Sequence, residues 1–107
     1  MKYATLAPAP VGSFGAIVTV PGGRKFEVLQ VSPSTFGGAA TTFYVARTLG
    51  GATFFTDHVA MAAGTFDATR QYHDLVLEAG DVLLVGFIGA GAGGEAAVVD
   101  YVDVAPA

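Results

Sequence analysis

The chain of 107 residues contains no cysteine and no tryptophan. Without cysteine, the protein has no disulfide framework and no thiolate metal site. Charged residues are also scarce, at 13% of the chain, and the five basic ones are scattered along it. A protein that binds nucleic acid needs clustered Lys and Arg side chains to neutralise phosphates. We therefore expect no nucleic-acid partner, in keeping with the net charge of −4.

Features of export and of membrane insertion are missing as well. The N-terminal stretch "MKYATLAPAPVGSFG" has one lysine but lacks the apolar core of a secretory signal. The uncharged stretch between Asp81 and Glu95 is too short and too rich in glycine to span a bilayer, which takes about 20 apolar residues. We expect a soluble protein that is made in the cytoplasm without a signal peptide and does not insert into membranes.

The chain does have many hydrophobic residues, 52% in all, in short runs separated by its fifteen glycines and five prolines. The runs are rich in β-branched and aromatic residues and lack helical spacing, which favours strands. The expected strands cover residues 15–20, 24–32, 39–48, 53–61, 65–73, a short piece of 75–81, 82–88 and 95–104. Turn signals such as "PGG" and "LGGA" separate them. This pattern predicts an all-β fold, a single antiparallel β-sandwich of about seven to eight strands.

We expect the sandwich domain over residues 13–104, with an extended N-terminal arm at 1–12 and a tail at 105–107. Pro8 and Pro10 fix φ and remove backbone donors, so their segment is not a central strand. Tyr3 and Leu6 are apolar, and a solvated tail gains nothing from them. The arm is therefore predicted to dock on another protein chain. The alternative is that it folds back and caps an open edge of its own sandwich.

Gly89, Gly91 and Gly94 form a literal GxGxxG after an apolar run. A dinucleotide-binding fold needs a helix after the glycines, a further parallel strand and an acidic residue about 20 positions on. Here the residues after Gly94 resemble a strand, and few residues remain. We interpret the glycines as a hairpin loop between the last two strands and expect no cofactor.

Two Asp–His dipeptides, Asp57-His58 and His73-Asp74, have the side chains of a metal site or of an acid–base pair. Neighbouring residues of a strand point to opposite faces, so neither dipeptide chelates from one side. In a simple hairpin about Ala63-Gly64, His58 lies opposite Thr69 and not opposite His73. No serine carries a nucleophile-elbow motif. We expect neither a metal site nor a catalytic site.

Four acidic residues offer calcium ligands but match no calcium-loop spacing: Glu78, Asp81, Asp100 and Asp103. Asp81 is expected to cap the turn before residues 82–88.

The aromatic residues provide the remaining candidates for a binding surface: Phe36, Phe54, Phe55 and Tyr72. Of the adjacent phenylalanines, one is expected in the core and the other at the surface, where a partner covers it or it stays exposed. Such rings can stack on sugars, although the absence of tryptophan disfavours a sugar platform.

Two segments resemble small virion proteins of tailed bacteriophages. The first, "VTVPGGRKFEVLQVSPSTFGGAATTFYVAR" (18–47), is similar to their strand, "PAG+" turn, strand, loop and strand. The second, "AAGTFDATRQYHDLVLEAGDVLLVGF" (62–87), is similar to their "aaGet…LvLeaGDvl.v" segment. The loop before the third strand departs from the asparagine-rich loop of the family, since it reads "SPSTFGG". The family has no catalytic residues to carry over.

The resemblance implies a virion protein, a β-sandwich that serves as a structural or accessory part of the head, neck or tail fibre. Its implied partners are other virion proteins or further copies of itself. The expected function is therefore a non-enzymatic assembly module. The alternative is a carbohydrate- or receptor-binding module on the same scaffold, with a host-surface glycan as partner, and an enzyme ranks third.

Overall fold

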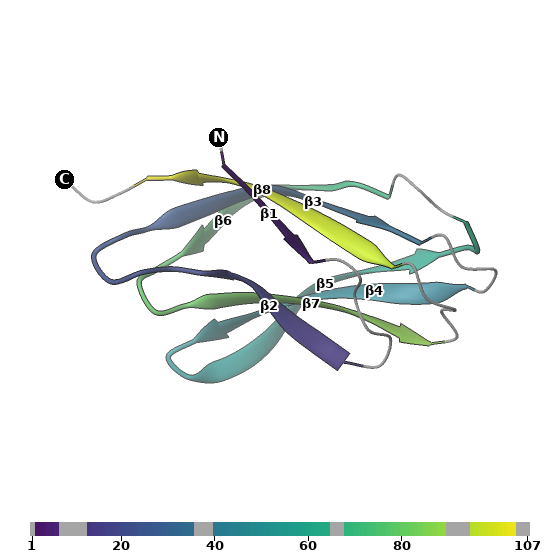
Figure 1. The fold of residues 1–107 in the computed structure, drawn as a ribbon. Helices are drawn as coiled ribbons and strands as arrows, with labels where there is room; N and C mark the ends of the chain where they lie inside the picture. The colour runs from purple at the N-terminus through teal and green to yellow at the C-terminus, as the bar shows by residue number, and fades with distance from the viewer. Residues whose placement is uncertain (1, 7–12, 36–39, 65–67, 90–94, 105–107) are drawn as a thin grey trace.

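The computed structural model describes residues 2–6, 13–35, 40–64, 68–89 and 95–104. Within these ranges the backbone forms eight β-strands and no helix. Figure 1 shows how the strands are arranged. The strands are β1 (Lys2–Leu6), β2 (Ser13–Thr19), β3 (Phe26–Ser34), β4 (Thr41–Leu49), β5 (Ala52–Met61), β6 (Arg70–Leu77), β7 (Val82–Gly89) and β8 (Ala96–Asp103).

The strands form two four-stranded sheets that lie one above the other (Figure 1). One sheet has the order β1-β8-β3-β6 and the other has the order β2-β7-β4-β5, and all described pairings are antiparallel. The predicted antiparallel β-sandwich is confirmed. The chain changes sheet at every connection except the β4–β5 hairpin. Two four-stranded sheets wound in this order form a jelly roll.

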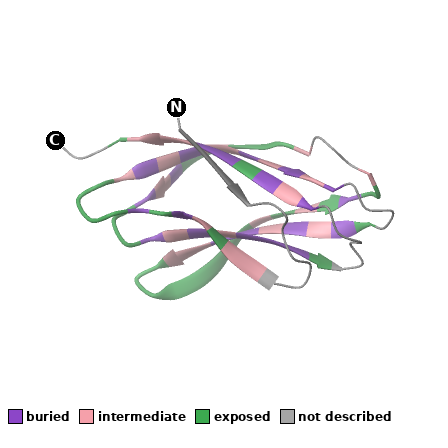
Figure 2. Ribbon diagram, in the orientation of Figure 1, coloured by how far each residue is buried: buried purple, intermediate pink, exposed green. Residues whose placement is uncertain are grey.

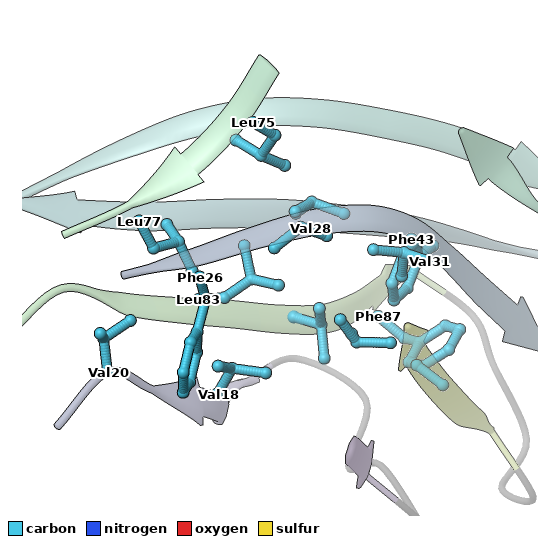
Figure 3. Packing of buried hydrophobic residues seen from close by; sticks show 14 of the residues in the cluster. Val18, Val20, Phe26, Val28, Val31, Phe43, Leu75, Leu77, Leu83 and Phe87 are labelled. Atoms are coloured by element: carbon cyan, nitrogen blue, oxygen red, sulfur yellow. The ribbon is translucent and has the colours of Figure 1, made fainter. Parts of the chain in front are cut away.

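The core lies between the sheets and comes largely from alternate residues of β3, β4, β7 and β8, because successive side chains of a strand point to opposite faces (Figure 2). Figure 3 shows how these side chains interlock. Within the core, the rings of Phe43 and Phe87 lie 5.0 Å apart (Figure 3). The buried cluster consists of Val18, Val20, Phe26, Val28, Val31, Phe43, Val45, Met61, Leu75, Leu77, Leu83, Val85, Phe87, Ala97 and Val99.

The turns follow the local chemistry of the sequence. Gly50 and Gly51 both have positive φ, 59° and 87°, as a two-residue hairpin of type I′ requires. Before β7, the Asp81 carboxylate accepts a hydrogen bond of 3.0 Å from the Glu78 N–H, which confirms the predicted turn cap. At the "PGG" turn, the Arg24 N–H donates to the Pro21 carbonyl.

Two predicted hairpins are wrong. The expected strands at 65–73 and 75–81 give way to the single strand β6, which contains Asp74 at a φ of 61°. Because β5 and β6 lie in different sheets, they do not form a hairpin, and the same is true of β7 and β8. The loop at residues 90–94 lies outside the described residues. Sequence spacing shows where a chain turns, but it does not show whether the next strand joins the same sheet.

The N-terminal segment also differs from the expectation. Residues 2–6 form β1, which pairs with β8 in the register Lys2↔Tyr101 to Leu6↔Ala97. This is the alternative in which the segment covers an edge of its own sheet. The two prolines stand after Leu6, so they do not prevent the pairing of residues 2–6. Pro8 and Pro10 lie outside the described residues, and docking of this arm on another chain stays a prediction.

Candidate interaction surface

The outer face of the β2-β7-β4-β5 sheet is apolar and rich in aromatic rings. Its residues include Phe14, Ala16, Thr42, Tyr44, Ala46, Phe55, His58, Ala60, Leu84, Gly86 and Ile88, of which Ala46 and Gly86 are buried beneath their neighbours. We call this surface the aromatic face. None of these described residues is Asp, Glu, Lys or Arg. An antiparallel sheet with one solvated face usually alternates apolar and polar residues, and the aromatic face departs from that pattern.

Three rings and an imidazole form a cluster on the aromatic face. Phe55 meets Phe14 and Tyr44 edge-on, with ring centroids 5.6 and 5.8 Å apart. Tyr44 also stacks on His58 at 5.9 Å. These are favourable aromatic geometries, worth about 0.5–1.5 kcal/mol per pair. The cluster therefore holds its exposed rings in fixed positions.

The cluster explains a glycine in the interior of β7. Phe14, Gly86 and Tyr44 stand side by side on adjacent strands. Phe14 and Tyr44 are two strands apart, about 9.6 Å at the usual strand spacing. Their ring centroids are nevertheless only 6.1 Å apart, so the rings lean towards each other above Gly86. A side chain at position 86 would occupy that space.

The aromatic face has a protrusion and a hollow. Phe55 protrudes near the β4–β5 hairpin and is 68% exposed. At the other end of the face lies a hollow of about 330 Å³. It is lined by Ala40, Thr41, Thr42, Ala60, Met61, Ala62 and Ile88. The face thus offers a ring at one end and an apolar recess at the other.

The outer face of the β1-β8-β3-β6 sheet has more polar groups, although Val98 (37% exposed) and Val102 lie on it too, and we call it the polar face. On it the Gln30 amide donates a hydrogen bond of 2.5 Å to the Asp100 carboxylate. The hydroxyls of Ser32 and Thr69 lie 3.0 Å apart. These two pairs of polar groups bond to each other, as is usual on a solvated sheet face.

A cluster around Asp57 joins the two sheets at the edge formed by β5 and β6. Asp57 points inward from β5, and its carboxylate accepts a hydrogen bond of 3.0 Å from the Tyr72 hydroxyl of β6. The Arg70 guanidinium lies 3.4 Å from the same oxygen. Burial raises the pKa of the Tyr72 hydroxyl well above its usual range, and the nearby Asp57 carboxylate raises it further. We call this group the Asp57 cluster.

The Asp57 cluster also protects an exposed edge. β5 has a register shift opposite Val45 and Ala46. Asp57, whose charged side chain points inward, is the first paired residue after this shift. A bulge and an inward-pointing charge both discourage another strand from pairing with a sheet edge.

The histidines do not come together. Asp57 points inward while His58 lies on the aromatic face, which confirms that the dipeptide does not act from one side. His73 belongs to β6, in the other sheet. Within the described part of the chain, no group of three His, Cys, Asp or Glu residues could hold a metal ion.

The four acidic candidates for calcium each have a partner in the protein. Asp81 caps its turn, and Asp100 accepts from Gln30. Asp103 pairs with Arg24, and Glu78 lies 3.4 Å from Lys25.

The predicted surface aromatics differ in how far they are buried. Neither Phe54 nor Phe55 enters the core, contrary to expectation, since they are 51% and 68% exposed. Both residues lie on the edge strand β5, close to the β4–β5 hairpin. At this end of β5 the opposite sheet does not cover the inward-facing Phe54, and Phe55 faces outward. Tyr72 is half-buried in the Asp57 cluster. Phe36 lies outside the described residues, and of Tyr3 and Leu6 only the backbone is described.

Sequence reasoning missed Phe14, Tyr44 and Gly86 as parts of one surface. A signal for it stands in β7, where "VLLVGFI" is apolar on both faces although the sheet is antiparallel.

Comparison of the chain with models of known families, with curated proteins and with solved structures found no match. No helix long and apolar enough to cross a membrane occurs in the described ranges.

Proposed function

We propose that the protein is a non-enzymatic structural or accessory component of a tailed phage or phage-like virion. The observation that supports this most is the aromatic face, a sheet surface without Asp, Glu, Lys or Arg among its described residues. An apolar patch of this kind on a small domain is typical of a surface that binds another protein. The resemblance of two segments to small phage virion proteins supports a phage or phage-like particle.

The fold and the polar residues agree with this function. Viral capsid proteins are among those that use the jelly roll, although lectins and cupins use it too, so the fold alone does not decide. The polar groups of the Asp57 cluster are engaged in joining β5 to β6, and those of the polar face bond to each other. Both arrangements serve structure.

The test is the composition of purified particles. Phage or phage-like particles whose genome encodes this chain are purified by density gradient, and the copy number of each protein is measured by quantitative mass spectrometry. We expect many copies of this chain per particle. Recovery of the chain only as a free monomer, with none in the particles, contradicts the proposal.

The second candidate is a carbohydrate-binding module, which the exposure of Phe55 beside Tyr44 favours. A sugar also needs polar groups that converge on its hydroxyls, and the aromatic face has few. Binding to a glycan array that is lost in Phe55→Ala and kept in Phe54→Ala supports this candidate.

A further inference from the structure

We propose that the aromatic face packs against the aromatic face of a second copy of this chain, about a two-fold axis. This inference rests on the proposed assembly function and adds the partner and the geometry. The central row of the interface is Phe14, Gly86, Tyr44 and His58, which stand side by side on the four strands.

The charges of the molecule favour a second copy. The chain carries a net charge of −4, yet none of the described residues on the aromatic face is Asp, Glu, Lys or Arg. Two copies can join these faces without burying an ion, which is a costly step. A basic or acidic partner finds no charge there to pair with. The remaining charges repel between copies, and salt screens that repulsion. Association therefore strengthens as the salt concentration rises.

The shape of the face complements itself. The backbone of Phe55 lies on one side of the central row, and its ring reaches over Phe14 and Tyr44 of that row. The hollow beside Thr42 and Ala60 lies on the other side of the row. A two-fold axis along the row reverses the strand direction and places position 55 of each copy opposite position 60 of the other, beside the hollow. A hollow of about 330 Å³ has room for a phenyl ring, since cavities of about 150 Å³ bind benzene.

The area of the face fits a weak dimer. Four strands spaced about 4.8 Å apart give a width of about 19 Å, and the outward rows extend over about 25 Å with their side chains. This is on the order of 500 Å² per copy, near the lower end of stable interfaces, at about 600 Å² per partner. We therefore expect a monomer–dimer equilibrium that depends on concentration.

The edge at β5 offers a poorer route to self-association than the aromatic face does. The bulge and the inward Asp57 protect this edge against pairing with a strand of another copy.

The first experiment is sedimentation velocity on the full chain from about 1 µM to 1 mM. Phe55→Asp and Phe54→Asp are a matched pair, because the two rings are adjacent and exposed but point to opposite faces. We expect the wild type to dimerise and Phe55→Asp to weaken the dimer at least about 30-fold, as for an interface hot spot. Phe54→Asp should change it less than about 3-fold. Equal effects of the two variants overturn the proposed face, and circular dichroism of dilute samples confirms that both variants are folded.

The second experiment tests the two-fold register. Phe55→Lys places a cation opposite position 60 of the other copy, and Ala60→Glu places an anion there. Each variant alone should be monomeric, and their mixture should form a heterodimer. A mixture that stays monomeric overturns the register.

Failure of this inference is distinguishable from failure of the proposed function. A wild type that is monomeric at 1 mM, yet enters particles and loses this ability with Phe55→Asp, shows that a different virion protein covers the face. That result overturns the self-association and leaves the assembly function standing. If the chain is absent from particles but dimerises in solution, the assembly function is overturned and the self-association stands.

Discussion

The strands β3 and β7 are both central strands of their sheets, paired on each side. Their inner faces are alike, with Val28 and Val31 in one and Val85 and Phe87 in the other, all buried. Their outer faces differ. β3 presents residues such as Gln30 to the surface, whereas β7 presents Leu84, Gly86 and Ile88.

This difference separates what folding requires from what association requires. The core needs one apolar face per sheet, and β3 supplies no more than that. The second apolar face of β7 contributes little to the monomer, because it has no layer of the same chain above it (Figure 2). Substitutions on the inner faces should therefore change stability alone, and substitutions on the outer face of β7 should change association alone.

The largest expected effect comes from the inner face of β7. Phe87→Ala removes a fully buried ring that packs on Phe43, and should lower the free energy of unfolding by about 3–5 kcal/mol. Urea denaturation at about 1 µM, where the proposed weak dimer dissociates, measures this loss. Leu84→Gln, on the outer face of the same strand, is the control. It should cost less than about 1 kcal/mol and weaken dimerisation. A loss for Leu84→Gln as large as that for Phe87→Ala contradicts the comparison.

The polar face gives the next largest effect. Gln30→Ala removes the amide that donates to Asp100, a residue that is only 9% exposed. Leaving this carboxylate without its donor should lower the free energy of unfolding by about 1–3 kcal/mol. Thermal and urea unfolding should show this loss, while sedimentation should show an unchanged monomer–dimer equilibrium. Gln71→Ala, at the exposed neighbouring position on β6, should cost less than about 0.5 kcal/mol. A change of dimerisation in Gln30→Ala would place the polar face in the interface as well.

The fold class was predictable because its signals are local. Alternating runs such as "FEVLQV" and turns such as Gly50-Gly51 each indicate a strand or its end without reference to distant residues. The order of the strands was not predictable in this way. The inward-facing residues of the strands are similar apolar side chains. The same sequence pattern is therefore compatible with β6 pairing with β5 in a hairpin or lying in the other sheet.

The aromatic face was only partly predictable for the same reason. Phe55 stood out as a surface candidate, and the two-sided apolar pattern of β7 is visible in the sequence. Phe14 and Tyr44 come from strands far apart in the chain and meet only because β7 lies between β2 and β4. The Asp57 cluster likewise joins β5 and β6 across the two sheets, and no spacing rule predicts it.

The Asp57 cluster predicts a dependence of stability on high pH. Burial and the Asp57 carboxylate raise the pKa of Tyr72, so the folded protein holds the phenolic proton more tightly than the unfolded chain does. The resulting stabilisation is complete below about pH 10, the pKa of an unfolded tyrosine, and is lost as the pH rises above it. Tyr72→Phe should cost about 1 kcal/mol at pH 7 through the lost hydrogen bond.

This difference between wild type and Tyr72→Phe should shrink when urea unfolding is repeated at pH 10 and pH 11. A difference that is constant across this range contradicts the role of the Tyr72 proton. The cluster belongs to neither outer face, so the dimerisation of Tyr72→Phe should equal that of the wild type.

The smallest expected effect concerns the second hydrogen bond of the polar face. The hydroxyls of Ser32 and Thr69 are 3.0 Å apart, but the pair is exposed, so water replaces either partner at little cost. Ser32→Ala should change the free energy of unfolding by less than about 0.5 kcal/mol and leave dimerisation unchanged. Ile88→Ser is the counterpart on the aromatic face, since Ile88 is also exposed, at 40%, but borders the hollow. It should weaken the dimer measurably in sedimentation while the dilute monomer keeps its stability. If Ser32→Ala weakens the dimer as much as Ile88→Ser does, exposure alone decides both effects and the two outer faces do not differ in function.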